Sequence, residues 1–176
     1  MQMEEISSLI EAHGTAVYRF CCKLAGNSAD ADDLYQETFL IALEQCHKID
    51  AARNPKAFLL SVAVKRWKSS RRTFARRQRL APTVPLLEGE GAAAAQNLEL
   101  SLAQQEALET VRQVAGELSD RYRIPIYLYY TVELDISEIS QVMKIPAGTV
   151  KSRLHKARSM MKKRLEELQY EMPEFI

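Results

Sequence analysis

An acidic segment early in the chain is the first place where side chains could do chemistry. Its carboxylates and its amide are Asp30, Asp32, Asp33, Gln36 and Glu37. Clustered carboxylates can hold Mg²⁺ for phosphoryl transfer, but no nucleophile or phosphate-binding loop accompanies them. Carboxylates also compensate the dipole at a helix start, which explains Asp30 and in part the next two aspartates, but not Gln36 and Glu37. We therefore expect no catalysis here, and the role of the last two residues needs another explanation.

The next segment is cationic. Every charged side chain from Arg53 to Arg79 is basic, and Phe58, Trp67 and Phe74 lie among the cations. Cations that follow a phosphate backbone, combined with aromatic faces on which bases stack, suit single-stranded nucleic acid. The position of Trp67 fits burial as well as stacking, and we expect both phenylalanines in the core.

A second basic block, from Lys151 to Arg164, has a pattern typical of duplex DNA binders. Asp135 and Glu138 have the spacing of a capping box, and a turn containing Gly148 separates this short helix from a longer basic one. A capped short helix, a tight turn and a basic helix are typical of a helix-turn-helix unit. The alternative, a solvated cationic face on an ordinary helical hairpin, is less favoured because the cap and the turn occur together.

The outer positions of the last helix follow from its buried stripe. With Val150 and Leu154 toward the core, the outer faces carry Lys151, Ser152, His155, Lys156 and Ser159, which can reach phosphates and base edges in a major groove. Thr149 lies at the helix start, where free backbone amides favour a phosphate. His155 has no partner at metal-binding spacing, so we interpret it as a polar surface side chain that can touch DNA.

Helical periodicity positions all of these residues, and no alternating pattern competes with it. The expected helices are 6–24, 28–42 with Ser28 as N-cap, 54–77 with Asn54 as cap and Pro55 in the first turn, 98–118, 119–132, 135–143 and a last one from about 148 to 168. The expected buried positions include Ile10, Ile41 and Leu168. The fold class is therefore all-α.

Residues 80–97 contain prolines, glycines and small residues without an apolar period, which predicts a flexible linker. We expect two small helical domains, 1–79 and 98–176. The net charge of +1 conceals the two basic blocks and an acidic stretch from 88 to 109. Two cationic surfaces joined by an anionic connector indicate two contacts with one nucleic acid.

The amino terminus lacks the basic start and apolar core of a signal peptide, and no apolar run approaches a membrane span. We therefore expect a cytoplasmic protein. Cys21, Cys22 and Cys46 are odd in number and lack zinc-site spacing, which favours small buried side chains in a reducing compartment. We expect no metal, no cofactor and no small-molecule substrate.

Residues 137–140 and 145–158 resemble the fourth region of extracytoplasmic-function (ECF) sigma factors of the sigma-70 family. In that family this region binds the minus-thirty-five promoter element. The resemblance implies DNA contacts by Thr149, Lys151, Ser152, Arg153, His155, Lys156 and Arg158, with Arg153 and Arg158 serving phosphates or helix packing.

Residues 30–39 resemble the sigma-family stretch that docks on the clamp coiled coil of the largest catalytic polymerase subunit. This resemblance implies polymerase binding by Asp32, Asp33, Leu34, Gln36 and Glu37. The following helix is similar to the one that, with the loop before it, captures the unpaired minus-ten element in the family. The implied residues are Asn54, Lys65, Arg66, Trp67, Ser69, Arg71 and Arg72.

The resemblance covers nearly the whole chain, and nothing resembles the first or third regions of housekeeping sigma factors. It implies a non-enzymatic subunit that binds core RNA polymerase, recognises duplex and melted promoter DNA and promotes opening, commonly under the control of an anti-sigma factor. The alternative function is a stand-alone helix-turn-helix regulator whose first domain dimerises or senses a ligand. A third class, an RNA-binding or nuclease accessory protein, has no evident use for the acidic segment.

Overall fold

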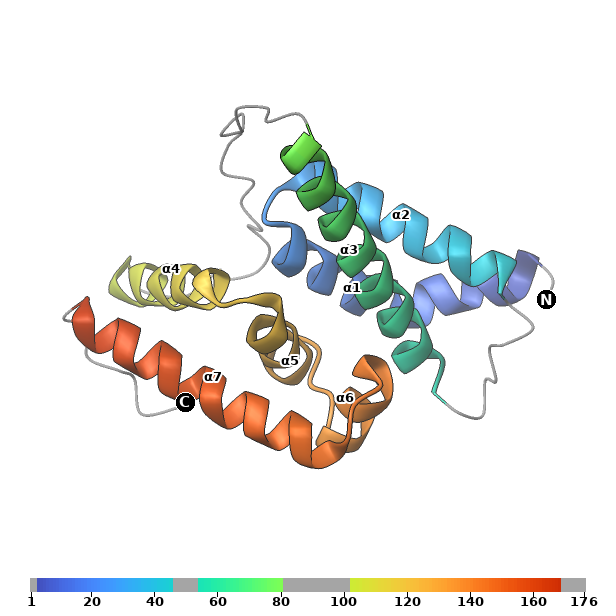
Figure 1. Ribbon diagram of the computed structural model, residues 1–176. Coiled ribbons are helices and arrows are strands. Elements are labelled where there is room, and N and C mark those ends of the chain that lie inside the picture. The colour runs from blue at the N-terminus through green and yellow to red at the C-terminus, as the bar shows by residue number, and fades with distance from the viewer. Residues whose placement is uncertain (1–2, 46–53, 81–101, 169–176) are drawn as a thin grey trace. The chain divides into compact units, whose positions relative to one another are not determined.

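The computed structural model describes residues 3–45, 54–80 and 102–168, and these ranges are helical apart from short connections (Figure 1). The helices are α1 (Met3–Ala25), α2 (Ser28–Glu44), α3 (Pro55–Leu80), α4 (Leu102–Glu117), α5 (Asp120–Tyr130), α6 (Ile136–Met143) and α7 (Ala147–Glu167). The described ranges contain no strand. The prediction of an all-α fold is confirmed.

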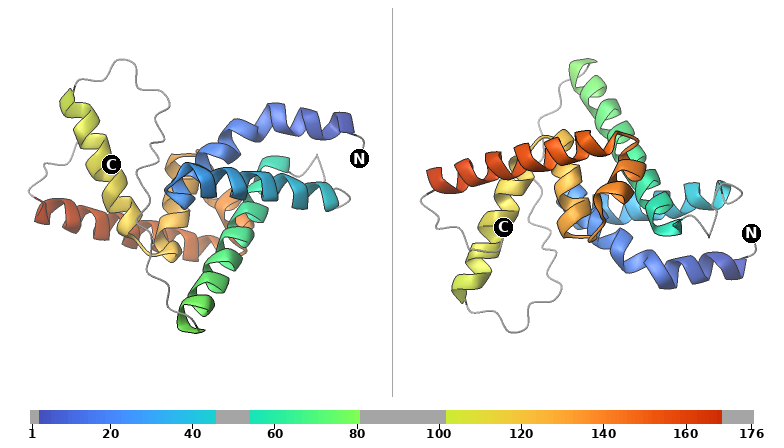
Figure 2. Two further views of the ribbon diagram at one scale, coloured as in Figure 1. Left: turned by 90° about the horizontal axis from the view of Figure 1, so that it is seen from above. Right: turned by 90° about the horizontal axis from the view of Figure 1, so that it is seen from below.

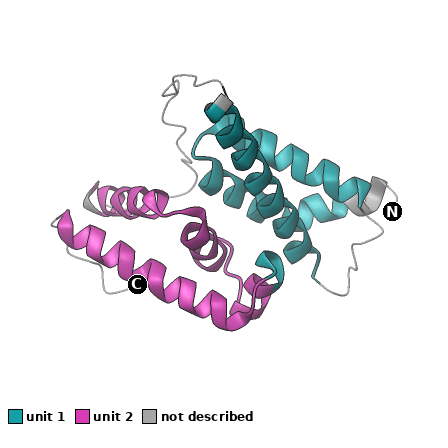
Figure 3. Cartoon of the chain, in the orientation of Figure 1, with its two compact units in different colours: residues 1–93, 141–144 teal, residues 94–140, 145–176 magenta. Residues whose placement is uncertain are grey.

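The chain divides into two compact units, coloured separately in Figure 3. The first unit is 1–93 with 141–144, and the second is 94–140 with 145–176. Two helical domains were expected and are present. Their boundaries at 79 and 98 stay a prediction, because 81–101 lies outside the described residues. Leu80, which was assigned to the linker, is instead the last residue of α3.

In the first unit, α1, α2 and α3 pack against one another (Figure 2). Gly26 has φ +79°, a left-handed conformation that side chains disfavour, and it ends α1 so that the chain can turn into α2. The core contains Val17, Phe20 and Leu24 of α1 and the fully buried Leu59 and Leu60 of α3. This three-helix core holds the exposed faces of α2 and α3 in fixed positions.

The helix caps of the first unit differ in part from expectation. Asn27, not Ser28, caps α2: its Oδ1 accepts a hydrogen bond of 2.8 Å from the backbone N–H of Asp30. Ser28 is the first helical residue instead, because Asn27 has the extended backbone of an N-cap, with φ −138° and ψ 160°. Asn54 caps α3 as predicted, with Oδ1 3.0 Å from the backbone N of Ala57.

In the second unit, α4 and α5 pack against α7. The core includes Ile124, Leu128, Ile139, Leu154 and Leu165. Helices α6 and α7 follow one another with the order and the short connection expected of a helix-turn-helix.

The predicted capping box before α6 is present, but the residue that makes the turn before α7 differs from the one predicted. The capping box is confirmed, since Glu138 accepts from the Asp135 N–H at 2.9 Å and Asp135 from the Glu138 N–H at 2.8 Å. The left-handed turn residue is Lys144, with φ +54°, whereas Gly148 lies in the first turn of α7.

Several burial predictions need correction. Ile10, Phe74 and Leu168 were expected inside and are exposed by 42%, 56% and 44%. Ile41 is only half-buried. Each of these residues lies seven positions along the chain from a buried residue of the same stripe, so the apolar stripe continues beyond the packed part of the helix.

The cysteines lie partly as expected. Cys21 is buried, which raises the pKa of its thiol to about 12, and Cys22 is half-buried. Cys46 lies outside the described residues. Both described cysteines are free thiols.

Candidate functional sites

The outer face of α2 carries most of the residues predicted to bind polymerase. Asp32, Asp33 and Gln36 are exposed there. Asp32 also accepts a hydrogen bond of 2.9 Å from the hydroxyl of Tyr18 on α1, and this bond raises the pKa of Tyr18 to about 12. Leu34 does not belong to this face, because its side chain is 5% exposed and packs in the core.

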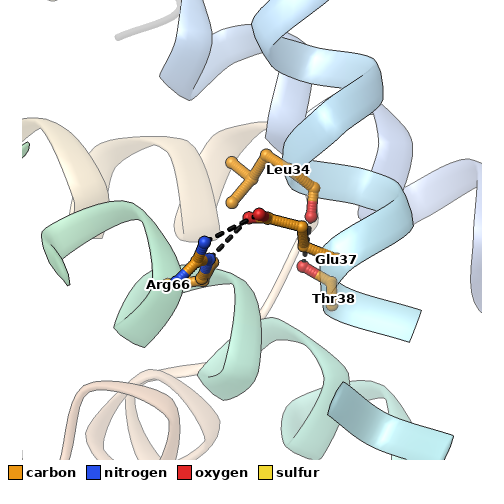
Figure 4. Close-up of polar contacts among 4 residues, drawn as sticks. All are labelled: Leu34, Glu37, Thr38 and Arg66. Carbon is orange, nitrogen blue, oxygen red and sulfur yellow. Dashed lines mark hydrogen bonds and ion pairs between the residues drawn. The ribbon is translucent and has the colours of Figure 1, made fainter. Parts of the chain in front are cut away.

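Glu37 lies differently from the other carboxylates, because it forms a two-point ion pair with Arg66 of α3. The Arg66 Nε is 2.5 Å from Glu37 Oε2, and Nη2 is 2.7 Å from Oε1. Figure 4 shows both carboxylate oxygens directed at the guanidinium. The hydrogen bonds from Arg66 lower the pKa of Glu37 and raise that of Arg66. The pair therefore joins a predicted polymerase contact to a predicted DNA contact.

Two exposed leucines extend the α2 face, and the sequence interpretation missed them. Leu40 is 58% exposed and Leu43 is 42% exposed. Leu40 follows Asp33 by two helical turns, so both project from the same side of α2. A surface with acidic, amide and apolar groups is suited to a protein partner. The helical spacing from Asp33 was the signal that could have identified Leu40.

On α3, the predicted minus-ten residues fall into exposed and structural groups. Lys65, Arg71 and Arg72 are exposed and Ser69 is half-buried. Asn54 caps the helix, as described above. Trp67 lies in the core, 8% exposed, with the guanidinium of Arg71 5.6 Å from its ring centre. Its ring is therefore packed within the unit and not presented for stacking.

The basic face of α3 continues further than predicted. Arg72, Arg76 and Arg79 are all exposed and repeat at helical spacing from Lys65, so the four share one stripe. Arg79 belongs to this stripe because α3 continues to Leu80 instead of ending near Arg77. This stripe provides a continuous cationic face.

The start of α7 presents most of the residues predicted to bind the minus-thirty-five element. Lys151, Ser152, His155 and Lys156 are exposed, and Thr149 is half-buried. The Ser152 hydroxyl donates to the Thr149 carbonyl at 3.0 Å. The arrangement leaves two ammonium groups and one imidazole on the outer side of the helix.

Two arginines of α7 have structural surroundings. Arg158 donates from Nε to the Tyr130 hydroxyl at 2.8 Å, and its guanidinium lies 5.4 Å and 5.6 Å from the ring centres of Tyr129 and Tyr130. Arg153 is half-buried, and its Nε is buried without a hydrogen-bond partner. These contacts of Arg158 are packing contacts, and its predicted contact with DNA stays a prediction.

Within 3–45, 54–80 and 102–168, no group of three or more His, Cys, Asp or Glu side chains is placed to hold a metal ion. Among the same residues, no helix has the length and apolar character required to cross a membrane.

The two units match two family models. Residues 9–78 match Sigma-70 region 2 and residues 108–161 match Sigma-70, region 4. The ECF RNA polymerase sigma factor SigM of Bacillus subtilis (strain 168) is 30% identical over 158 residues, which cover 89% of this chain and 93% of SigM. The chain belongs to the ECF family of RNA polymerase sigma factors. Its partners are accordingly core RNA polymerase and promoter DNA.

A second relative agrees with this assignment, and a solved structure shares the fold. SigW, also an ECF RNA polymerase sigma factor of Bacillus subtilis (strain 168), is 28% identical over 170 residues, covering 94% of this chain and 91% of SigW. The fold is shared with the sigma factor RpoE of Bartonella quintana, solved with the anti-sigma factor NepR. That comparison has a TM-score of 0.77 and 21% identity, and covers 93% of this chain and 98% of RpoE.

The family assignment decides between the functions considered from the sequence. A stand-alone helix-turn-helix regulator is not favoured, because the first unit matches a sigma region of its own. The sigma factor acts in promoter recognition and transcription initiation.

Proposed function

We propose that this sigma factor divides its work among three helix faces. The outer face of α2 docks on core polymerase, α3 holds the melted minus-ten strand, and the start of α7 binds the duplex minus-thirty-five element. The observation that carries the proposal is the charge separation within one unit, where exposed carboxylates lie on α2 and a continuous basic stripe lies on α3.

Polymerase docking rests on Asp32, Asp33 and Gln36, with Leu40 as the apolar centre of the contact. Acidic and amide groups around an exposed leucine suit a basic protein partner, since charge steers association and apolar burial stabilises the complex. The Tyr18 hydroxyl holds the Asp32 carboxylate in one orientation, which reduces the entropy lost on docking. Glu37 contributes to docking through the part of its carboxylate that stays exposed beside Arg66.

DNA binding on α3 rests on Lys65, Arg71, Arg72 and Ser69, with Asn54 at the start of the helix. On α7 it rests on Lys151, Ser152, His155 and Lys156, with Thr149 at the helix start. In a helix-turn-helix the first residues of the second helix contact base edges. The lysines then supply phosphate attraction, and Ser152 and His155 can hydrogen-bond to bases.

Promoter opening by this arrangement requires no catalytic residue and no cofactor. A surface that binds the unpaired strand more tightly than the duplex shifts the equilibrium toward the open state. We therefore propose a non-enzymatic role. Because its polymerase and DNA partners occupy the bacterial cytoplasm, we place the protein there as well.

We propose an anti-sigma factor as a further partner. The support is the RpoE structure, in which a sigma factor of the same fold is bound to the anti-sigma factor NepR. Two experiments test this. The tagged chain should capture an anti-sigma factor from its own cells, and deletion of the gene for that factor should increase sigma-dependent transcription.

Association with purified core polymerase tests the docking face. Asp33→Ala combined with Leu40→Ala should weaken binding at least about tenfold, since interface residues with large effects cost about 2 kcal/mol or more. Glu11→Ala, an exposed carboxylate of α1, is the matched control and should bind normally. Circular dichroism verifies that the variants are folded. Full co-elution of the double variant with core polymerase would remove α2 from the interface.

A further inference from the structure

A groove at the junction of α5 and α6 has no role in the proposed contacts. It is open, has a volume of about 420 Å³ and is lined by Tyr129, Glu133, Leu134, Asp135 and Ile136. The lining therefore combines the end of α5, the start of α6 and the connection between them (Figure 1). All five residues belong to the second unit.

The backbone holds the wall of this groove in one conformation. The N–H of Leu134 donates to the carbonyl of Leu128 at 3.1 Å, and the N–H of Val132 donates to the carbonyl of Tyr127 at 3.3 Å. Between them, Glu133 has a left-handed conformation, with φ +59°, and its side chain is exposed. A groove that is formed before its partner arrives loses less entropy on docking.

The groove has an apolar base. Leu134 is 2% exposed, and Tyr129 and Ile136 are half-buried. Beside them, Tyr130 is 45% exposed, and its ring centre lies 4.9 Å from that of Tyr129 in an edge-on arrangement. Aromatic side chains are enriched at protein interfaces relative to the rest of the surface. The base and the neighbouring ring therefore suit an apolar side chain of another protein.

The rim of the groove is acidic. Glu133 and Asp135 are exposed, and among the described residues no basic side chain lines the groove. One carboxylate oxygen of Asp135 accepts the hydrogen bond of the capping box, which leaves the other available. Arg158 lies over the rings of Tyr129 and Tyr130 and donates to the Tyr130 hydroxyl, so this cation is already engaged. The charge that lines the groove is therefore negative.

Negative charge disfavours DNA in this groove and favours a basic protein. The carboxylates repel phosphates, whereas a Lys or Arg beside an apolar side chain satisfies both the rim and the base. In a helix-turn-helix the first helix crosses the DNA backbone while the second enters the major groove. A protein that reaches the start of α6 on a promoter therefore lies beside the DNA. Proteins that bind DNA carry basic surfaces of this kind.

We propose that this groove docks a basic and apolar segment of a second protein that is bound to DNA beside the minus-thirty-five element. Such a protein recruits the sigma factor to a promoter whose own sequence binds α7 weakly. The two contacts reinforce each other because one DNA molecule holds both proteins, which raises their effective concentration. The inference goes beyond the proposed function, in which the sigma factor recognises the promoter by itself, and it rests on the proposed contact between α7 and duplex DNA.

Peptide selection tests the chemistry of the groove. The probe is a phage library of random 12-residue peptides, selected on the full-length chain with excess sonicated DNA to occupy the basic faces. Phage that also bind the Glu133→Lys variant are removed, which discards peptides held by other acidic surfaces such as that of α2. The remaining peptides should carry Lys or Arg next to a large apolar residue.

Fluorescence anisotropy then measures the affinity of the enriched peptides. Glu133→Asn should weaken binding at least about tenfold, because the peptide's cation loses its partner. This variant should keep its fold, since Asn tolerates a left-handed backbone, and thermal melting verifies it. Glu106→Lys is the matched control, because it reverses an exposed carboxylate of α4 that does not line the groove. It should bind the peptides as wild type does.

Recruitment is measured with an enriched peptide fused to an unrelated DNA-binding domain, whose operator is placed upstream of the minus-thirty-five element. Run-off transcription by the holoenzyme should rise at least about tenfold with wild type and remain unchanged with Glu133→Asn.

Three results would overturn the proposal: no enrichment of basic and apolar peptides, equal peptide affinity of wild type and Glu133→Asn, or no recruitment by the fusion. Displacement of the peptide by core polymerase would also overturn it, because the groove would then belong to the polymerase contact. Peptide binding is measured without polymerase or a promoter, so failure of the sigma function is distinguished from failure of the groove.

Discussion

Glu37 on α2 and Arg66 on α3 bind each other through two hydrogen-bonded ion-pair contacts, at 2.5 Å and 2.7 Å (Figure 4). The resemblance to sigma factors assigned the first residue to polymerase and the second to DNA. In the folded chain, each is the partner of the other. A substitution at either position therefore changes both faces of the first unit, and single variants cannot assign a role to one residue alone.

A double-mutant cycle on stability measures this coupling. Glu37→Gln, Arg66→Gln and the double variant should give a favourable interaction of at most about 1 kcal/mol in urea unfolding, because such half-exposed pairs are screened by solvent. The side chains are 42% and 40% exposed, which sets this upper limit. Strictly additive effects of the two substitutions would show that the pair adds nothing to stability.

The same pair predicts a pH dependence. Arg66 lowers the pKa of Glu37 below its ordinary value of 4.5, so the unfolded chain binds the proton more tightly than the folded chain. The stabilisation is therefore fully present above about pH 5 and is lost as the pH falls through the lowered pKa. The difference in unfolding free energy between wild type and Glu37→Gln should shrink over this acid range. A difference that is constant with pH would contradict the assignment.

Contacts of α7 with duplex DNA are tested by salt dependence. Replacing Lys151 and Lys156 with alanine should weaken binding of a minus-thirty-five duplex and reduce the log–log salt slope by about one unit for each lost phosphate contact. Lys163→Ala is the matched control, an exposed lysine of the same helix well beyond its first turns. Equal footprints and slopes for wild type and the double variant would remove these lysines from the interface.

Arg158 is expected to act in packing. Arg158→Ala removes its hydrogen bond to Tyr130 and its contacts with two tyrosine rings, which should cost about 1 kcal/mol and lower the melting temperature of the second unit by about 4–8 °C. The salt slope for duplex binding should not change. A slope reduced by one unit with unchanged melting temperature would instead make Arg158 a phosphate contact.

The features that local chemistry controls could be predicted from the sequence. The Asp135–Glu138 capping box, the Asn54 cap and the end of α1 at Gly26 depend only on residues a few positions apart. The cap of α2 was assigned one residue late because Asn27 and Ser28 are both good N-caps, and only the backbone conformation chooses between them.

Features that depend on packing between helices could not be predicted in this way. The spacing of Glu37 and Arg66 carries no signal of their pairing, because it arises from the angle at which α3 crosses α2. Trp67 and Phe74 lie seven residues apart in one basic helix, yet the first is 8% exposed and the second 56%. The mismatch between composition and burial at Phe74 became visible only in the structure.

Run-off transcription with purified core RNA polymerase tests the central claim most directly. The account predicts that the chain makes core enzyme start at a defined site, and that this start is lost when the α2 face or the beginning of α7 is substituted. A chain that supports no initiation at any defined site with core polymerase, yet binds a palindromic operator on its own, would contradict it.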